Sequence, residues 1–208
     1  GSGNSVTNLF SNAGTYQVGL KIITNYNDSD STYQSVVINP IATANFFAPE
    51  VCEGNATSFT DNSSIASGSI VTYEWDFDND GFYDDATGST ASNEFPSYGT
   101  FPAGLRVTSD SGCVSIVSKN VTVNPNPTVD FTFTEVCIGD TASLNGTASV
   151  ATGTVDTYEW ELNGDNQFND STGQSINHEF INWGNHLVGL KVTTNKGCMA
   201  QVSHVVTV

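Results

Sequence analysis

The chain has 208 residues and carries 22 acidic against 5 basic residues, which gives a formal net charge of −17. This charge argues against nucleic acid and anionic membrane surfaces as partners, because both attract Lys and Arg. A hydrophobic content of 38% suffices for packed cores, and no apolar run reaches the roughly eighteen residues that insertion into a membrane needs.

Residue types that favour strands and turns dominate the chain, so we expect an all-β protein. In the first predicted strand, residues 16–23, the side chains of Tyr16, Val18, Leu20 and Ile22 fall on one face. This period of two is typical of a half-buried antiparallel strand. Further strands are expected at residues 56–60, 70–77 and 114–123.

A repeat of 85 residues organises the sequence. Tyr-Glu-Trp at 73–75 recurs at 158–160, and a Val-Cys pair and a Gly-Cys pair recur with the same shift. The alternating strand occurs three times, starting near residues 14, 99 and 184. The layout predicts two complete repeats, 41–123 and 126–208, preceded by the C-terminal half of another repeat, 1–38.

Half a β-sandwich cannot bury its sheet faces alone, so we expect the chain to be part of a longer array of repeats. The joints between repeats are short and contain Pro40, Pro125 and Pro127. Proline stiffens such joints, which favours an extended rod over a flexible chain.

Several repeated positions carry distinctive side chains. Trp75 and Trp160 are expected in the cores of the two complete repeats. Trp183 could stack on a carbohydrate, but we expect it to pack at the rim of its sandwich. Three basic residues share one outward strand position, where they would protect a sheet edge or aid solubility: Lys21, Arg106 and Lys191.

The repeated residues resemble the PKD domain family. The resemblance rests on Tyr-Glu-Trp-Asp-Phe-Asp at 73–78, on Phe95 and Gly99, and on the strand Phe-x-Ala-x-Leu-x-Val at 101–107. It implies tandem immunoglobulin-like β-sandwiches. Two departures are that Asp78 replaces a family glycine and that the turn of the last repeat reads Trp-Glu-Leu-Asn-Gly-Asp at 160–165.

The cysteine-bearing form of the repeat is similar to repeats of giant surface proteins of gliding Bacteroidota, which use type IX secretion. This resemblance implies an extracellular, cell-surface stalk segment of a long adhesin filament, with a role in cell adhesion or gliding motility. Its partners would be neighbouring repeats of the same chain and surface polysaccharide or another cell-surface protein. The alternative is an accessory polysaccharide- or protein-binding PKD module of a secreted hydrolase.

No catalytic constellation emerges from the sequence, so we expect no enzymatic activity. The three histidines, His178, His186 and His204, belong to the last repeat and lack the spacing of metal ligands. His186 takes the inward place of Tyr16 in the repeated strand, which indicates a core or rim residue. Asp-Ser-Gly at 110–112 indicates a turn rather than a serine nucleophile.

The four cysteines predict one disulfide in each complete repeat, Cys52–Cys113 and Cys137–Cys198. The two members are 61 residues apart in both repeats, which selects this pairing among the three possible ones. A link from Cys113 to Cys137 would leave Cys52 without a partner, because Asp28 stands at the aligned position of the preceding repeat. Disulfides indicate an oxidising, extracellular setting.

A cluster of aspartates follows Trp75 and predicts a calcium site. Its candidate ligands are Asp76, Asp78, Asp80, Asp84 and Asp85. Ligand sets made of oxygen alone favour Ca²⁺, and the order Asp-x-Asp-x-Asp-Gly resembles the start of an EF-hand loop, although Thr87 stands in place of its glutamate. The alternative is that these aspartates shape a turn by bonding their own backbone.

The last repeat carries a diluted version of this cluster. The equivalent residues are Glu161, Asn163, Asp165, Asn169 and Asp170. Because two of the five carboxylates have become amides, we expect weaker calcium binding there or none.

Overall fold

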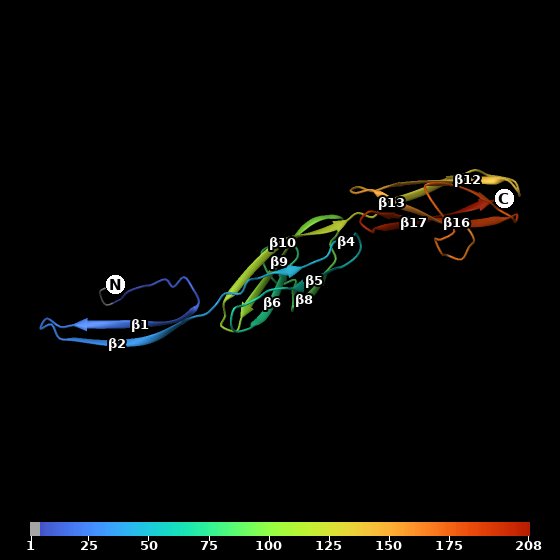
Figure 1. Ribbon diagram of the computed structural model, residues 1–208. Coiled ribbons are helices and arrows are strands. Elements are labelled where there is room, and N and C mark those ends of the chain that lie inside the picture. Colours follow the sequence, from blue (N-terminus) through green and yellow to red (C-terminus); the bar gives the residue numbers. More distant parts are fainter. Residues whose placement is uncertain (1–4) are drawn as a thin grey trace. The chain divides into compact units, whose positions relative to one another are not determined.

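The computed structural model describes residues 5–208 as an all-β protein (Figure 1). Residues 1–4 of the predicted half repeat lie outside the described residues. The first two strands, β1 (Gly14–Ile23) and β2 (Ser29–Ile38), form a two-stranded antiparallel sheet. Val18, Leu20 and Ile22 of β1 are 44%, 60% and 58% exposed. The predicted inward face of this half repeat is therefore uncovered in the described part of the chain.

The repeat 41–123 forms two sheets, as an immunoglobulin-like sandwich requires. One sheet has the order β3-β5-β8 and the other the order β4-β10-β9-β6-β7. The strands are β3 (Phe46–Phe47), β4 (Val51–Cys52), β5 (Thr57–Asp61), β6 (Ile70–Asp76), β7 (Ala86–Thr87), β8 (Thr90–Asn93), β9 (Gly99–Ser109) and β10 (Val114–Asn124).

The repeat 126–208 repeats this plan with sheets β11-β12-β15 and β14-β13-β16-β17. Its strands are β11 (Thr128–Phe133), β12 (Thr141–Ser149), β13 (Val155–Glu161), β14 (Ser171–Thr172), β15 (Ser175–Glu179), β16 (Asn185–Thr194) and β17 (Met199–Thr207). The strands predicted at residues 56–60, 70–77 and 114–123 correspond to β5, β6 and β10, and the alternating strand expected near residue 184 is β16. The predicted fold class is confirmed.

Two compact units make up the chain, and their boundary does not follow the repeats. One unit comprises Pro49–Thr57, Asn93–Phe101 and Val121–Val208. The other comprises the rest of the described residues. The segment Pro49–Thr57, which contains Cys52, thus belongs to the same unit as the repeat 126–208. No helix in the described part of the chain is long and apolar enough to cross a membrane.

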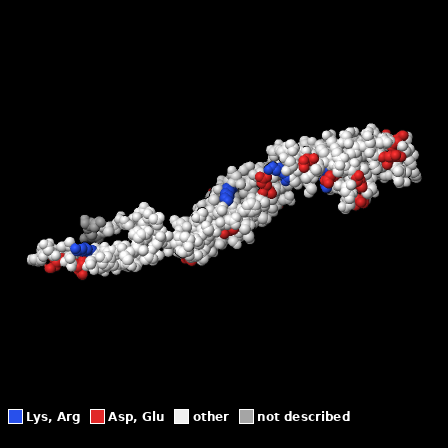
Figure 2. Space-filling view, in the orientation of Figure 1, with Lys and Arg blue, Asp and Glu red and all other residues white. Residues whose placement is uncertain are grey.

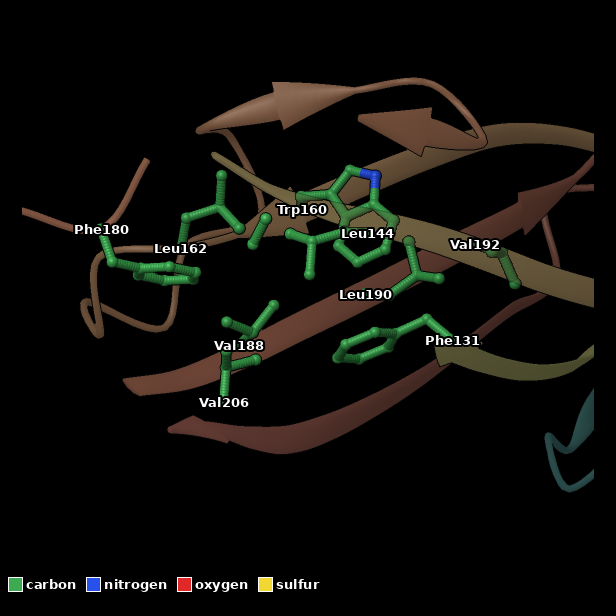
Figure 3. Packing of buried hydrophobic residues seen from close by; sticks show 10 residues of the cluster. Phe131, Leu144, Trp160, Leu162, Phe180, Val188, Leu190, Val192 and Val206 are labelled. Carbon is green, nitrogen blue, oxygen red and sulfur yellow. The ribbon is translucent and has the colours of Figure 1, made fainter. Parts of the chain in front are cut away.

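Tryptophan lies at the centre of the core of each complete repeat, as predicted. Trp160 is fully buried and packs among Phe131, Leu144, Leu190 and their neighbours (Figure 3). Its Nε1 donates to the carbonyl of Gly173 at 2.8 Å. Trp75 is equally buried, lies within 5.4 Å of the ring centroids of Phe46 and Phe59, and donates to Gly88 at 2.9 Å. The inward residues of β9 and β16 are likewise buried, so the predicted strand faces are confirmed: Ala103, Leu105, Val107, Val188, Leu190 and Val192.

The shared basic position forms cross-strand ion pairs. Arg106 binds Glu74 through two hydrogen bonds of 2.8 and 2.9 Å, and Lys191 lies 2.9 Å from Glu159. Both basic residues stand on β9 and β16, which are interior strands of their sheets. The edge-protection interpretation is therefore wrong for these two residues. Acidic side chains nevertheless dominate the charged groups on the visible face (Figure 2).

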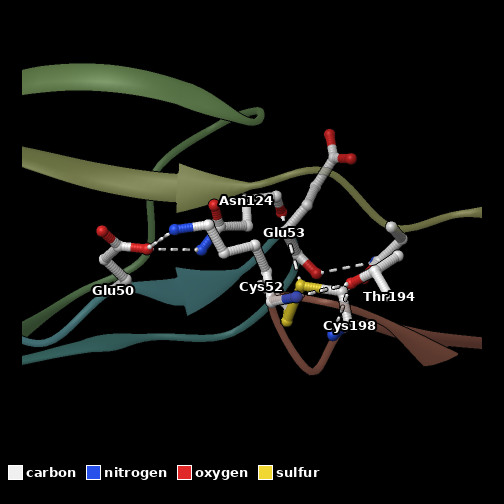
Figure 4. Close-up of a disulfide and its surroundings, with 8 residues drawn as sticks. Glu50, Cys52, Glu53, Asn124, Thr194 and Cys198 are labelled. Carbon is white, nitrogen blue, oxygen red and sulfur yellow. Dashed lines mark hydrogen bonds and ion pairs between the residues drawn. A yellow bond between two sulfur atoms is a disulfide. The ribbon is translucent and has the colours of Figure 1, made fainter. Parts of the chain in front are cut away.

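The predicted disulfide pairing is wrong. The bond joins Cys52 to Cys198, across 146 residues and from one repeat to the next (Figure 4). Cys113 and Cys137 are free thiols. In the parallel alignment of β4 with β10, Cys52 lies opposite Asn124, the last residue of β10. Cys113 directly precedes the first residue of β10. At about 3.3 Å per residue, β10 separates these two cysteines by roughly 30 Å, far beyond disulfide reach.

Candidate metal centre

The aspartate cluster occupies the turn between β6 and β7. Trp75 pairs with Ala86 across these antiparallel strands, and this pairing brings Asp85 back beside Asp76. The side-chain oxygens of Asp76, Asp78 and Asp85 lie within 4.8 Å of one another. Among residues 5–208, these three form the group of His, Cys, Asp or Glu side chains that could hold a metal ion.

All three carboxylates also hold the turn together, Asp78 by accepting from the backbone N–H of Asp80. Asp76 accepts hydrogen bonds from the backbone N–H groups of Asn79 and Gly81, at 2.6 and 3.1 Å. Asp85 accepts from Phe77 and Asp78 at 2.5 and 3.3 Å. The prediction that these aspartates shape the turn through their own backbone is therefore confirmed. The two bonds to Asp76 go to different oxygens, and both bonds to Asp85 go to its Oδ2. Lone pairs therefore remain on both oxygens of Asp76 and on Asp85 Oδ1, so turn formation and cation binding are compatible.

Asp80 and Asp84 do not join the three-carboxylate group. Asp80 accepts from the backbone N–H of Phe82 at 2.7 Å and donates its own N–H to Asp78 at 3.1 Å. The structure thus brings together three of the five predicted ligands.

Asp76 differs from expectation in its burial. Because Trp75 and Phe77 point into the core, side-chain alternation along the strand predicts that Asp76 and Asp78 project from the other face. Asp76 is nevertheless only 4% exposed. Burial, followed by the charge of Asp76, raises the pKa of the Tyr83 hydroxyl above its ordinary value. A buried carboxylate gains most from a bound cation, because little water screens the attraction.

The equivalent turn of the last repeat is closed by an amide. Glu161, buried like Asp76, accepts from the backbone N–H groups of Asn163 and Gly164. Asp170 accepts from Leu162 at 2.6 Å. The Nδ2 of Asn163 then donates to the second oxygen of Asp170 at 2.9 Å. The neutral amide of Asn163 therefore binds Asp170 at the position that the carboxylate of Asp78 occupies in the other repeat.

The histidines form no metal cluster within the described residues. His178 and His186 each lie 4.6 Å from the ring of Phe180, and His186 contacts the carbonyl of Asn182 at 2.9 Å. His186 is predicted to be a core or rim residue, and its half-buried side chain corresponds to the rim. Burial lowers the pKa of His178, and the charge of His186 adds to this effect against the opposing charges of Asp170 and Glu179.

The proposed turn at 110–112 is also confirmed. The Asp110 carboxylate accepts from the backbone N–H and the hydroxyl of Ser69, at 3.0 and 3.1 Å. The Ser111 hydroxyl contacts Ser109 at 3.1 Å.

The last repeat contains a cleft that the sequence does not indicate. The cleft measures about 650 Å³ and is bordered by the turn at 162–164, the end of β15 and the segment that leads into β16. Ile181 lines it, and Trp183 in the same segment is 83% exposed. The expectation that Trp183 packs at the rim is therefore wrong. The sequence shows the tryptophan, but it shows neither the exposure of Trp183 nor the cleft that its segment borders.

The chain resembles known proteins in sequence and in fold. The family model described as "PKD domain" matches residues 37–123 and 124–208. The pre-pro-metalloprotease PrtV of Vibrio cholerae is 26% identical over 197 residues, which are 89% of this chain and 20% of that protein. The chain therefore spans a fifth of the length of this relative.

Two solved structures are similar to parts of the chain. The PKD1 domain of the Vibrio cholerae metalloprotease PrtV is 28% identical, covers 41% of this chain and 98% of its own, and gives a TM-score of 0.34. The eight N-terminal Ig domains of Down Syndrome Cell Adhesion Molecule are 14% identical, cover 92% of this chain and 35% of their own, and give a TM-score of 0.51. The second likeness concerns the immunoglobulin-like fold alone.

Proposed function

Because the chain belongs to the PKD domain family, we propose that it is a non-catalytic accessory segment of a secreted protein and contacts an extracellular polysaccharide. The relationship to a pre-pro-metalloprotease supports an accessory role, since the matched region is a fifth of that relative. The disulfide supports an extracellular location. Calcium at the three aspartates would stabilise the segment outside the cell.

The exposed Trp183, in the segment that borders the cleft, is the observation that carries the contact with polysaccharide. Trp183 presents a flat indole ring that can stack on the apolar face of a sugar. Asn182 and Asn185 line the cleft beside it and offer amide donors and acceptors for sugar hydroxyls. The chain's charge of −17 favours a neutral polysaccharide over an anionic one.

Co-sedimentation with insoluble polysaccharides such as chitin and cellulose tests this proposal, with gelatin as the protein polymer. We expect the chain to sediment with a polysaccharide and Trp183→Ala to remain in solution. Tyr98→Ala is the matched control, because Tyr98 holds the equivalent place in the other repeat and is 46% exposed. Binding to gelatin alone, or binding that Trp183→Ala leaves unchanged, would contradict it.

A second candidate function is a stalk segment of a long cell-surface adhesin of the kind found in gliding Bacteroidota, exported by type IX secretion. The Cys52–Cys198 bond favours it, because a covalent link between repeats resists pulling forces. Force spectroscopy should show that reduction releases about 50 nm of additional chain from the 146-residue loop. The sequence of the full-length protein distinguishes the two functions. Similar repeats throughout would indicate a stalk, whereas a catalytic domain would indicate an accessory segment.

A further inference from the structure

Cys113, a free thiol, lies in the same backbone setting as the bonded Cys198. The N–H of each cysteine donates at 3.1 Å to a hydroxyl four residues earlier, on Ser109 and on Thr194. The carbonyl of each accepts from that same residue, at 2.9 and 2.8 Å. The glycines before them have φ angles of 79° and 78°. The turn that presents Cys198 to its partner is therefore already formed at Cys113.

Cys137, the other free thiol, lies in the same loop as the bonded Cys52. The carbonyl of each accepts from a backbone N–H three residues later at 3.0 Å, from Asp140 and from Asn55. The glycines two residues after them have φ angles of 84° and 81°. Each free cysteine therefore reproduces the backbone of one half of the Cys52–Cys198 bond.

The free and bonded cysteines differ in how far a neighbouring repeat buries them. Cys198 is only 1% exposed, whereas Cys113 is half-buried. Val51 and Cys52 form β4 against β10, whereas Val136 and Cys137 form no strand and Cys137 is exposed. Cys137 lines a hollow of about 440 Å³ together with Glu135, Val136, Asp140 and Thr207.

The polar contacts around the existing bond indicate what would fill this hollow. The Glu50 carboxylate accepts from Lys196 Nζ at 3.0 Å and from Asn124 Nδ2 at 3.2 Å (Figure 4). Glu135 holds the position of Glu50 in the repeat register and lines the hollow. A lysine at the Lys196 position of a further repeat would therefore find the same carboxylate beside Cys137.

We propose that Cys137 and Cys113 are half-sites of two more disulfides of the Cys52–Cys198 type. Cys137 bonds the Gly-Cys turn of a PKD repeat that follows along the chain. Cys113 bonds the Val-Cys loop of a repeat that precedes it. Each joint in such an array then carries one disulfide between successive sandwiches. The equal cysteine spacing within repeats does not indicate this pairing.

Bond formation needs an oxidant, which an extracellular low-molecular-weight disulfide such as oxidised glutathione supplies. One cysteine thiolate attacks that disulfide, forms a mixed disulfide and releases one glutathione thiolate. The second cysteine thiolate then displaces the other glutathione. The two cysteines lose two protons and two electrons in total, and one oxidised glutathione becomes two reduced molecules.

The test extends the full chain after Val208 by a copy of residues 124–208, in which Ile138→Val marks the added Val-Cys loop and Met199→Leu marks the added Gly-Cys turn by their masses. The protein is refolded with oxidised and reduced glutathione, alkylated without reduction and mapped by mass spectrometry. We expect Cys137 to lose its reactivity towards iodoacetamide and to be linked to the marked peptide. Cys113 should stay fully reactive, which makes it the internal control, and the retained Cys52–Cys198 link reports correct folding.

A second extension guards against a failure of the first to fold. It adds a copy of residues 39–123, marked by Val114→Ile, whose Gly-Cys turn should bond Cys137 in the same way. Cys137 that stays alkylatable in both extended chains would overturn the proposal. A bond from Cys137 to Cys113, or to an early cysteine of the added repeat, would overturn it equally.

Discussion

Asn163 donates a hydrogen bond of 2.9 Å to Asp170, whereas the equivalent residues of the other repeat, Asp78 and Asp85, are two carboxylates that converge with Asp76. The two turns otherwise share their backbone hydrogen bonds, from Leu162 to Asp170 and from Phe77 to Asp85. The two turns therefore differ in charge at the position of Asn163 and Asp78. In the last repeat the amide of Asn163 donates to the Asp170 carboxylate, whereas in the other repeat the carboxylate of Asp78 brings a third negative charge beside Asp76 and Asp85.

This contrast predicts that calcium stabilises the repeat 41–123 and leaves the repeat 126–208 nearly unchanged. At about a hundred times its dissociation constant, calcium contributes about 2.7 kcal/mol, which raises the melting temperature of a domain of this size by about 10–20 °C. Calorimetry of the full chain with calcium and with a chelator should show this rise in one transition. Asp78→Asn should abolish the rise.

The reciprocal change, Asn163→Asp, supplies the matched control. It creates three carboxylates in the last repeat, so we expect a lower melting temperature in chelator and a new response to calcium. A calcium response that persists in Asp78→Asn, or that both repeats share in the natural chain, would rule out the three-aspartate site.

The disulfide predicts the thiol reactivity and the stability of the chain. Iodoacetamide should label Cys113 and Cys137 and leave Cys52 and Cys198 unlabelled. In the chain-entropy model, a closed loop of 146 residues contributes about 5 kcal/mol, so the double change of Cys52 and Cys198 to serine should lower the urea midpoint. The double change of Cys113 and Cys137 to serine should have little effect. Labelling of Cys198 in the folded chain would disprove the bond.

The fold was predictable from the sequence because its signals are local and occur repeatedly. Alternating side chains mark β9 and β16, and the tryptophans mark the cores. The burial of Leu105, Leu190, Trp75 and Trp160 follows from these patterns. In β1 the same alternation stays exposed, because burial depends on a second sheet that the described part of the half repeat does not provide.

The disulfide and the ligand set depend on distances that sequence spacing does not contain. Cys52 and Cys113 are as far apart in the sequence as Cys137 and Cys198. This equal spacing shows only that the cysteines occupy equivalent positions in the two repeats. The length of β10 then decides that Cys52 and Cys113 cannot meet. Likewise, the count of aspartates indicates a site, but the β6–β7 pairing decides that Asp85 joins Asp76 and that Asp84 does not.

The buried tryptophans predict a sharp difference between core and surface substitutions. Trp160→Phe removes ring volume from a fully buried site and leaves the Gly173 carbonyl without its donor. We expect a loss of about 2–4 kcal/mol from the cavity and the lost hydrogen bond. Trp183→Phe, at an exposed site, should change the unfolding free energy by less than about 0.5 kcal/mol. Equal urea midpoints for the two variants would contradict the assigned core.

His178 predicts that the last repeat loses stability in mild acid. Burial holds the pKa of His178 below its ordinary value in the folded chain, whereas the unfolded chain binds the proton near pH 6.5. Below that pH the unfolded state binds more protons than the folded state, so stability falls as the pH falls. The loss is complete only below the folded pKa.

Melting temperatures measured between pH 7.5 and 5.5 should therefore decline in the natural chain and decline less in His178→Gln. This window lies above the ordinary pKa of the carboxylates, about 4, so their protonation contributes little. His204→Gln is the control, because His204 stands on β17 and its Nε2 lies 2.7 Å from Asp130. Loss of that ion pair should not reduce the decline in acid. An identical decline in His178→Gln and in the natural chain would show that the half-buried imidazole of His178 does not govern the acid response.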